Sequence, residues 1–476
     1  MKYDVIVIGG GVIGAAVLDE LARYKLKALL LEAEDDVATG ASRANSGIVH
    51  AGYDCKPGTL KARFNREGAA MMEKLAYELD VPFLKCGSIV AAAADGLDAL
   101  KELRERGLKN GIPTEIIDRE QILKLEPNVS ESVEYALYAK QAAVISPYKL
   151  TVALAERAVK RGAEIRLEAA AESIEKTDDG FMVKTPKGEF CADVVVNAAG
   201  GGAARINRLL GAEEHQVNYQ RGDYFVLDTT ERKKINLVIF PLPTKLGKGI
   251  LAAPTADGNV ILGPTAINVE EGDTAVTKEG IEQIKSQITK TYRMPDYRKV
   301  IRLYSGVRAI SGEDFVIQKS ALVNGFIYLI GICSPGLTAA PAIAKHVVNE
   351  LISTYKPLVL KENTIVELER RVKAAHLDAD KLNALVKSDP AFGRIVCRCE
   401  KVTEAEVLLA IRSAVPATTI DAVKRRVRAG MGRCQGGFCA PRILEILSRE
   451  LKIPLNEVKK GGKDSFIAMS KIKEEL

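Results

Sequence analysis

The sequence has no tryptophan, and aromatic residues make up only 5% of its 476 residues. It also has no apolar run of the roughly 18 residues that a membrane-spanning helix needs. The net charge of +6 is small for this length and gives no reason to expect a nucleic-acid partner. Apolar residues still amount to 47%, which is ample for a large core. The length predicts about three domains.

The N-terminus leaves no room for a signal peptide, because the first expected strand already starts at Tyr3. We therefore expect a cytoplasmic protein without a transmembrane segment. A peripheral membrane contact through a partner stays open.

The stretch from Asp4 to Glu32 predicts a βαβ unit. A β-branched run enters a turn in which Gly9, Gly11 and Gly14 have the G-x-G-x-x-G spacing, and a second apolar strand ends at Glu32. This pattern is typical of dinucleotide binding. The glycines allow a tight turn and a close approach of a pyrophosphate, while the acid accepts hydrogen bonds from ribose hydroxyls. The alternative is an ordinary strand-to-helix turn.

A loop of small and polar residues follows and ends in Asn45-Ser46-Gly47-Ile48-Val49-His50-Ala51-Gly52. This sequence motif resembles that of the FAD-dependent oxidoreductases of the D-amino-acid-oxidase type. Within this superfamily it resembles the branch that contains glycerol-3-phosphate dehydrogenases and L-2-hydroxyglutarate dehydrogenases. Later segments resemble the same family in the same order. They are the strand and glycine turn Asp193–Gly202, the Gly306-x-Arg308 motif, and the final strand and turn Phe326–Thr338.

The resemblance implies a mixed α/β and α+β fold with a Rossmann-like FAD-binding domain, an antiparallel-sheet substrate domain and a small helical C-terminal iron–sulfur domain. Between His215 and Tyr297, expected strands do not alternate with expected helices. This independently favours antiparallel strands there. We expect residues 1–80, 146–210 and 300–350 in the FAD domain, 81–145 and 211–299 in the substrate domain, 351–390 as a helical linker, and 391–476 as the iron–sulfur domain.

The resemblance also implies which residues contact FAD. We expect the N-terminus of the last helix to point its dipole at the flavin. The predicted cofactor residues are Gly9, Gly11, Val12, Ile13, Gly14, Glu32, Ala33, Thr39, Ser42, Asn45, Ser46, Gly47, Ala199, Gly200, Gly306, Arg308, Gly331, Gly336, Leu337 and Thr338.

His50 is the best candidate for a catalytic base, because it ends the loop expected at the flavin face and its unperturbed pKa lies near neutral. Arg308 is the best anchor for an anionic substrate, since its planar fork matches carboxylate or phosphate oxygens. Arg221, Tyr53 and Lys248 are weaker candidates. A structural histidine and an ordinary salt bridge are the alternatives for the first two.

Four of the eight cysteines cluster near the C-terminus as C-x-C and, 34 residues later, C-x4-C. Four thiolates can hold structural zinc or an iron–sulfur cluster. The spacing of Cys397, Cys399, Cys434 and Cys439 resembles the bacterioferritin-associated-ferredoxin-like (BFD-like) [2Fe-2S] domain. We expect nearby cations, including Arg425 and Arg426, to offset the cluster charge; a DNA-contacting helix is the alternative for this basic run.

The leading hypothesis is oxidation of glycerol 3-phosphate to dihydroxyacetone phosphate, with electrons leaving through the cluster to a second redox subunit or another acceptor. Asp54 and Cys55 stand where glycerol-phosphate members often carry an arginine. This departure keeps an L-2-hydroxyglutarate or other 2-hydroxyacid dehydrogenase as the alternative. An amine or amino-acid dehydrogenase subunit and a non-enzymatic electron-transfer subunit also stay open.

Overall fold

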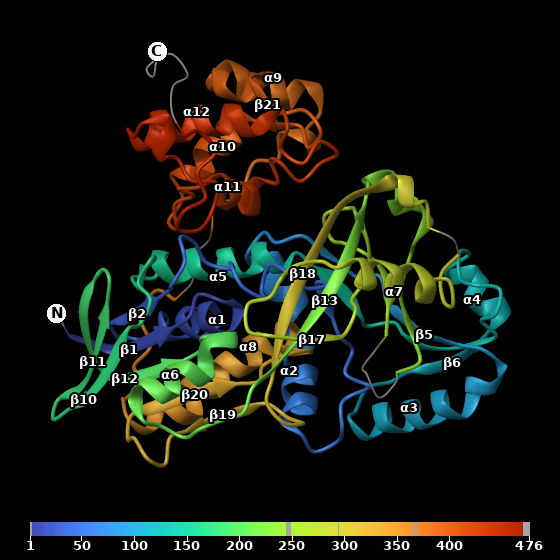
Figure 1. Ribbon diagram of the computed structural model, residues 1–476, viewed down its shortest axis with the longest axis horizontal. Coiled ribbons are helices and arrows are strands. Elements are labelled where there is room, and N and C mark those ends of the chain that lie inside the picture. The colour runs from blue at the N-terminus through green and yellow to red at the C-terminus, as the bar shows by residue number, and fades with distance from the viewer. Residues whose placement is uncertain are drawn as a thin grey trace.

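The computed structural model describes residues 2–243, 249–293, 295–364, 366, 368 and 370–469. The chain forms an α/β domain at the N-terminal side, a second domain built on a large sheet, and a small helical C-terminal module above them (Figure 1). Throughout these ranges, the helices are too short or too polar to cross a membrane.

The α/β domain is built on an eight-stranded sheet with a parallel centre, in which β9, β2, β1, β12 and β20 lie side by side. Strand β12 uses its first half for the antiparallel β11 and its second half for β20. The strands are β1 (Lys2–Ile8), β2 (Ala28–Leu31), β9 (Glu164–Arg166), β10 (Ser173–Thr177), β11 (Gly180–Thr185), β12 (Gly188–Asn197), β19 (Val316–Lys319) and β20 (Phe326–Ile330).

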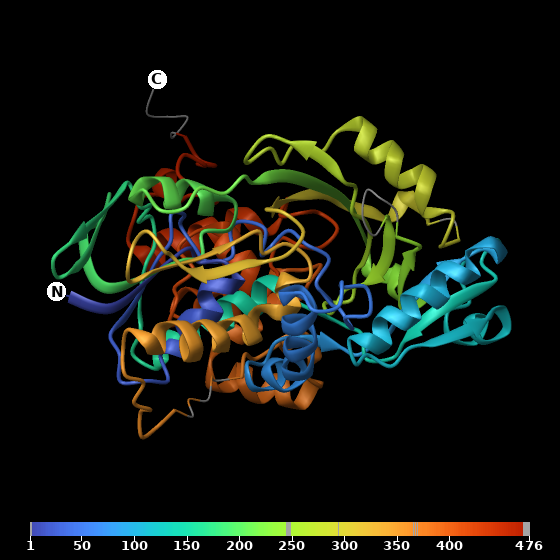
Figure 2. The same ribbon diagram turned by 90° about the horizontal axis from the view of Figure 1, so that it is seen from below.

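Strands β1, β2 and β20 are apolar and almost entirely buried because helices cover the sheet. Helices α2 and α8 pack closely against each other, and Figure 2 shows them in blue and orange. A Cβ on Gly68 would lie 2.0 Å from the Thr338 carbonyl oxygen, so only glycine permits this approach. The helices are α1 (Val12–Leu21), α2 (Leu60–Glu78), α5 (Pro147–Lys160), α6 (Ala203–Leu210) and α8 (Gly336–His346). The sequence predicts a helix from Ala340 to Leu351, and α8 begins four residues earlier, at Gly336.

The second domain contains a nine-stranded sheet in which all pairs are antiparallel except β14 with β5. Its strands are β5 (Ser88–Ala92), β6 (Glu115–Asp118), β7 (Tyr135–Ala139), β13 (Asn218–Leu227), β14 (Val238–Pro241), β15 (Leu251–Pro254), β16 (Val260–Gly263), β17 (Ile267–Val269) and β18 (Val300–Ile310). Its helices are α3 (Leu97–Lys109), α4 (Arg119–Leu125) and α7 (Lys278–Ile288).

Strand β18 corrects one expected boundary. We expected residues 300–350 in the FAD domain, but β18 pairs with β13 along nearly its whole length and therefore belongs to the second sheet. The chain returns to the first sheet only at β19. A small sheet of β3 (Ile48–Val49), β8 (Ala143–Ile145) and β4 (Phe83–Leu84) lies at the crossing of the two domains.

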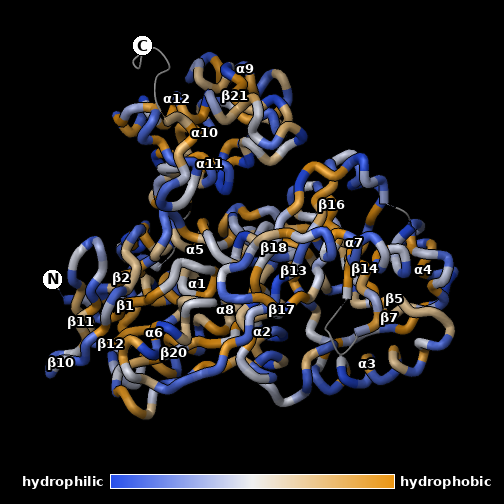
Figure 3. The backbone as a smooth tube through the Cα atoms, in the orientation of Figure 1, coloured by the Kyte–Doolittle hydropathy of each residue, from blue (hydrophilic) through white to orange (hydrophobic). Residues whose placement is uncertain are grey.

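Hydrophobic residues concentrate in the central strands and in α1, whereas the outer helix α3 is mostly hydrophilic (Figure 3). One core lies between the first sheet and helices α1, α2, α5 and α8, and another fills the second domain. The C-terminal module has its own core around Val407, Val423 and Ile443. It therefore folds around an apolar centre of its own.

The module contains α9 (Ala379–Ser388), β21 (Ile395–Cys397), β22 (Val402–Thr403), α10 (Glu404–Ile411), α11 (Ile420–Val427) and α12 (Cys439–Leu451). The spacing of Thr403 and Glu406 predicts a capping box, and the structure forms one at the start of α10. The segment 351–390 is less helical than expected, because its described part before α9 has only short turns such as Ala374–His376.

Candidate functional site

A cavity of about 1570 Å³ extends from the glycine turn after β1 to the second sheet. Its wall includes Gly9 and Gly11 at one end and Phe240 and Arg308 at the other. The two domains and the C-terminal module all contribute to it. Clefts between domains are common positions for cofactor and substrate sites.

The glycine turn has the geometry that the fingerprint predicts. Gly9 has a φ of +110°, and a Cβ there would lie 2.5 Å from the Ala198 carbonyl oxygen. A Cβ on Gly14 would lie 1.9 Å from the Gly9 carbonyl oxygen, so this glycine lets α1 pack directly against the turn. The N-terminus of α1 thus faces the cavity with its dipole and free N–H groups.

Glu32 stands at the end of β2 and is buried at the cavity wall. Its carboxylate accepts hydrogen bonds from the backbone N–H groups of Gly10 and Glu34. Burial raises its pKa, although these bonds oppose the shift. The side chain is therefore fixed at the position where the fingerprint places a ribose.

The structure brings most predicted cofactor residues to this cavity. Its wall contains Gly9, Gly11, Val12, Ile13, Glu32, Ala33, Thr39, Ser42, Asn45, Ser46, Ala199, Gly200, Gly306, Arg308, Gly336 and Leu337. The Ser42 hydroxyl accepts a 2.8 Å hydrogen bond from the Val12 N–H and so holds the small-residue loop to the start of α1.

Four predicted cofactor residues are not among the described residues that line this cavity: Gly14, Gly47, Gly331 and Thr338. A Cβ on Gly47 would lie 2.5 Å from the Ile145 carbonyl oxygen, so Gly47 allows close backbone packing. The Thr338 hydroxyl accepts a 3.0 Å hydrogen bond from the backbone N–H of His50. These residues shape the site from behind.

His50 lines the far end of the cavity and follows strand β3. Its Nε2 lies 3.2 Å from the Ser334 hydroxyl, and its ring centroid lies 6.0 Å from that of Phe240. Ser334, in the turn before α8, and Phe240, on β14, also line the cavity. An imidazole with a hydroxyl partner in such a place can take up or release a proton.

Arg308 also reaches this end of the cavity, from strand β18. Its Nη2 donates a 2.7 Å hydrogen bond to the Thr265 carbonyl oxygen. A Cβ on Gly222 would lie 2.7 Å from the same nitrogen, so the neighbouring strand leaves room for the guanidinium. This hydrogen bond orients the guanidinium of Arg308. Its other N–H groups can face an anion.

The weaker candidates lie elsewhere. Arg221 is buried and forms ion pairs with Asp223 at 2.9 Å and with Asp273 at 3.0 Å. It is not among the described residues that line the cavity. Tyr53 is buried in the second domain, and burial raises its pKa above its usual range. Lys248 lies outside the described residues.

Several wall residues were absent from the sequence-based prediction. Phe240 and Tyr224 look like ordinary core residues of the second sheet in the sequence, and nothing in their spacing marks them. Tyr224 stacks on Tyr304 at a centroid distance of 4.7 Å. Cys333 also lines the cavity. Asp421, Arg425 and Lys460 of the C-terminal module also line it.

The four clustered cysteines lie in two close pairs, Cys397 with Cys439 and Cys399 with Cys434, which join the end of β21 to the start of α12. Cys399 and Cys434 have their sulfurs 3.9 Å apart. A hydrogen bond from the Cys439 thiol, with backbone N–H groups in support, lowers the pKa of Cys397 to about 6. Within the described ranges, no three His, Cys, Asp or Glu side chains converge as a single metal-binding group.

The surroundings of these thiols fit an iron–sulfur cluster. Backbone N–H groups of Phe438 and Gly436 point at the Cys434 sulfur and lower its pKa. A Cβ on Gly432 would lie 2.3 Å from the Cβ of Cys399, so the glycine lets the two turns approach. Amide donors around thiolates are what such clusters need.

The role expected of Arg425 and Arg426 needs correction, whereas Arg433 does interact electrostatically with Cys399. Arg425 and Arg426 bind the carboxylate of Asp36 in the first domain, and Arg433 pairs with Asp228 of the second. These arginines therefore attach the module to the rest of the chain, since their charges already have carboxylate partners there.

The fold and the cavity define a flavin-dependent oxidoreductase joined to an iron–sulfur module, and comparisons with known proteins agree. The model of the FAD dependent oxidoreductase (DAO) family matches residues 4–350, and that of the BFD-like [2Fe-2S] binding domain matches residues 395–449. The chain belongs to the FAD dependent oxidoreductase family and carries a BFD-like [2Fe-2S] domain. Its cofactors are FAD and a [2Fe-2S] cluster.

Three similar proteins extend this result. A glycerol 3-phosphate dehydrogenase of Caloramator mitchellensis is 42% identical over 100% of both chains. A glycerol 3-phosphate oxidase of Mycoplasma genitalium is 35% identical over 73% of this chain and 94% of its own. The structure of L-alpha-glycerophosphate oxidase from Mycoplasma pneumoniae with FAD bound covers 78% of this chain and 99% of its own, at 30% identity and a TM-score of 0.73.

Proposed function

We propose that this chain oxidises glycerol 3-phosphate to dihydroxyacetone phosphate. The observation that carries the proposal is the glycerol 3-phosphate dehydrogenase relative, which is 42% identical over its whole length, cluster module included. The cavity supports it, because both an arginine, Arg308, and a histidine, His50, line it together with the glycine turn.

In this proposal, each residue at the catalytic end has a distinct task. The guanidinium of Arg308 binds the substrate phosphate through paired N–H donors. Nε2 of His50 takes the proton of the substrate hydroxyl group, which replaces the Ser334 hydroxyl as the hydrogen-bond partner of this nitrogen. Phe240 and Tyr224 give this end apolar walls that limit water. Bound FAD supplies the acceptor for the hydride.

We also propose that electrons leave through the cluster to a partner, either a second redox subunit or another acceptor. A second cavity of about 840 Å³ supports this route, because the loop residues Asn45 and Gly47 line it together with Met431 and Gln435 of the cluster turns. The loop expected at the flavin and the turn before α12 that carries Cys434 therefore line one cavity. The cytoplasmic location expected from the sequence stays a prediction.

A substrate screen tests the proposed reaction. The oxidised protein is mixed without oxygen with glycerol 3-phosphate, L-2-hydroxyglutarate or amino acids, and the flavin absorbance is followed. We expect bleaching by glycerol 3-phosphate and not by the other two classes. Bleaching by L-2-hydroxyglutarate or by an amino acid alone would replace the proposed substrate, and no bleaching would favour a non-enzymatic electron carrier.

A further inference from the structure

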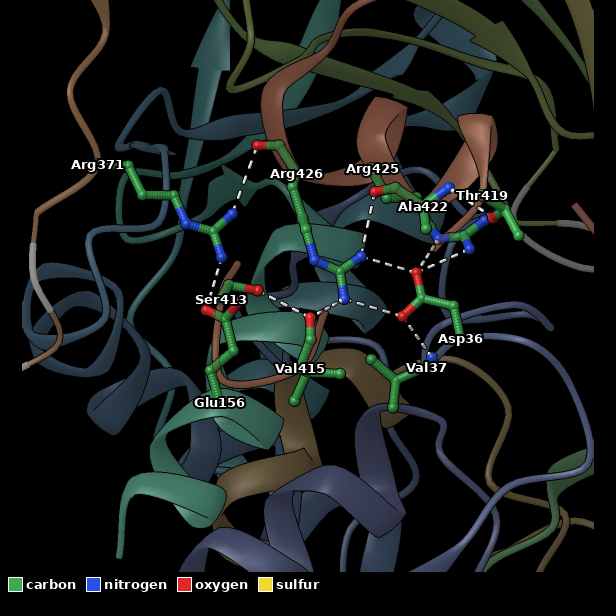
Figure 4. A network of polar contacts seen from close by, with 10 residues as sticks. All are labelled: Asp36, Val37, Glu156, Arg371, Ser413, Val415, Thr419, Ala422, Arg425 and Arg426. Atoms are coloured by element: carbon green, nitrogen blue, oxygen red, sulfur yellow. Dashed lines mark hydrogen bonds and ion pairs between the residues drawn. The ribbon is translucent and has the colours of Figure 1, made fainter. Parts of the chain in front are cut away.

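The C-terminal module is attached to the first domain by a buried ionic cluster (Figure 4). The Asp36 carboxylate lies 2.8 Å from Nη2 of Arg425 and 2.8 Å from Nη1 of Arg426. The side chains of Asp36 and Arg426 are 0% exposed, and that of Arg425 is 5% exposed. Burial alone would raise the pKa of Asp36, but the two arginines hold this pKa below its usual value. The carboxylate is thus a charged anchor within the interface.

Asp36 belongs to the loop that builds the cavity wall next to Glu32. Its neighbours Glu34 and Asp35 line the cavity. Two residues further on, the Ala38 N–H donates a 3.0 Å hydrogen bond to the Gly10 carbonyl oxygen in the glycine turn. The module is therefore attached to the same loop that completes the dinucleotide fingerprint.

The module also supplies part of the wall itself. Asp421 and Arg425 of α11 line the cavity together with the segment 460–462. This segment is held to α11 by a 2.7 Å hydrogen bond from the Asp421 N–H to the Lys460 carbonyl oxygen. On the other side, Nζ of Lys459 lies 3.0 Å from Oε1 of Glu168 in the first domain.

These module residues share the cavity with Gly9, Gly11 and Glu32, which define the adenosine end of a dinucleotide site. We propose that the iron–sulfur module forms the outer wall of the FAD site at its adenosine end, and that its attachment through Asp36 retains the cofactor. The adenosine diphosphate half of FAD is the ligand part that this wall contacts. FAD and the attached module then stabilise each other, because each favours the closed arrangement of the same loop.

The release of FAD from the complete holoprotein tests this proposal. Asp36→Asn keeps the size of the side chain but removes the charge that both arginines share. Asp228→Asn is the matched control, because it breaks the module contact with Arg433 at Asp228, which lies outside the described cavity wall. Freed flavin is measured by its fluorescence after dilution, while the visible spectrum and iron content show that the cluster is intact.

We expect Asp36→Asn to accelerate FAD release at least about tenfold and Asp228→Asn to change it less than about twofold. Release of FAD from Asp36→Asn at the wild-type rate, with the cluster intact, would overturn the proposal. Equal acceleration by both variants would overturn it as well, because any loosening of the module would then suffice.

A surface variant covers the case in which Asp36→Asn does not fold. Lys459 is 28% exposed, so Lys459→Met removes its pair with Glu168 without emptying a core. We expect about threefold faster FAD release from this variant, because the segment 460–462 loses the ion pair that holds it to the first domain. An unchanged rate from Lys459→Met would then count against the proposal. The readout is FAD release, so its outcome is independent of which substrate the enzyme oxidises.

Discussion

The two ends of the cavity are built in different ways. The first domain's part of the adenosine end comes from one short stretch of chain, in which the turn at Gly9, the acid Glu32 and the anchor Asp36 lie within 28 residues. The proposed catalytic end comes from three widely separated regions of the chain, which carry His50, Phe240, and the pair Arg308 and Ser334. Cofactor binding is thus specified largely by local sequence, whereas the chemistry depends on how two domains meet. Substitutions at one end should therefore leave the function of the other intact.

Replacement of His50 should have the largest effect. We expect His50→Gln to slow flavin reduction by glycerol 3-phosphate by roughly 10²–10⁴-fold, the usual contribution of a general base. The backbone bond from His50 to Thr338 stays, so FAD content should not change. Stopped-flow absorbance without oxygen measures the rate. Reduction within threefold of the wild-type rate would mean that His50 is not the base.

Removal of the Arg308 side chain should weaken substrate binding next most strongly. We expect Arg308→Ala to lower the affinity for glycerol 3-phosphate roughly 100-fold, because about 2–3 kcal/mol of charge-assisted hydrogen bonding is lost. The substrate concentration that half-saturates flavin reduction measures this change.

Arg221→Ala is the matched comparison for Arg308→Ala, since both arginines lie on paired strands of the second sheet. It should lower the unfolding temperature, because it leaves the buried Asp223 without its closest ion pair. The substrate affinity should be kept. Equal losses of affinity in both variants would show that the anion site extends to Arg221.

A methyl group at the adenosine end should change FAD binding without affecting catalysis by the loaded enzyme. Gly14→Ala places a Cβ 1.9 Å from the Gly9 carbonyl oxygen, which forces α1 away from the turn at a cost of about 1–3 kcal/mol. We expect a lower ratio of FAD to protein after purification. Gly202→Ala is the control, because its nearest contact would be at 4.0 Å. Full FAD occupancy in Gly14→Ala would contradict the close packing described.

The smallest expected effect concerns the charge of Lys424 between the module and the first domain. Burial, reinforced by nearby cations such as Arg302, lowers its pKa to about 8. The unfolded chain therefore binds this proton more tightly, and stability should rise as the pH increases from about 8 to 10.5.

Lys424→Met should accordingly stabilise the protein by about 1 kcal/mol at pH 7, because a largely buried charge is removed while its partner Asp421 keeps the closer ion pair with Lys460 at 3.3 Å. The gain should shrink at higher pH, where the wild-type lysine becomes neutral. Urea unfolding at pH 7 and at pH 9.5 measures the difference. A gain that grows with pH would have the wrong sign for this explanation.

The same contrast between local and distant features decides what the sequence can predict. The glycine turn and the capping box at Thr403 depend on residues close together, so their geometry follows from spacing. Strand β18 was assigned to the wrong sheet because Gly306-x-Arg308 was interpreted as part of the flavin domain, whereas its backbone pairs with β13. The role of Asp36 also escaped prediction, because nothing in the acidic run Glu34-Asp35-Asp36 signals which acid has a partner almost 400 residues away.

The most direct test of the account follows the electrons from one addition of substrate, first to the flavin and then to the cluster. The oxidised holoprotein receives less than one equivalent of glycerol 3-phosphate without oxygen, and the flavin absorbance and the electron paramagnetic resonance of the reduced cluster are recorded together. We predict that the flavin bleaches and that the cluster signal then appears within the same molecule. A flavin that is reduced while the intact cluster stays oxidised would contradict the exit of electrons through the C-terminal module.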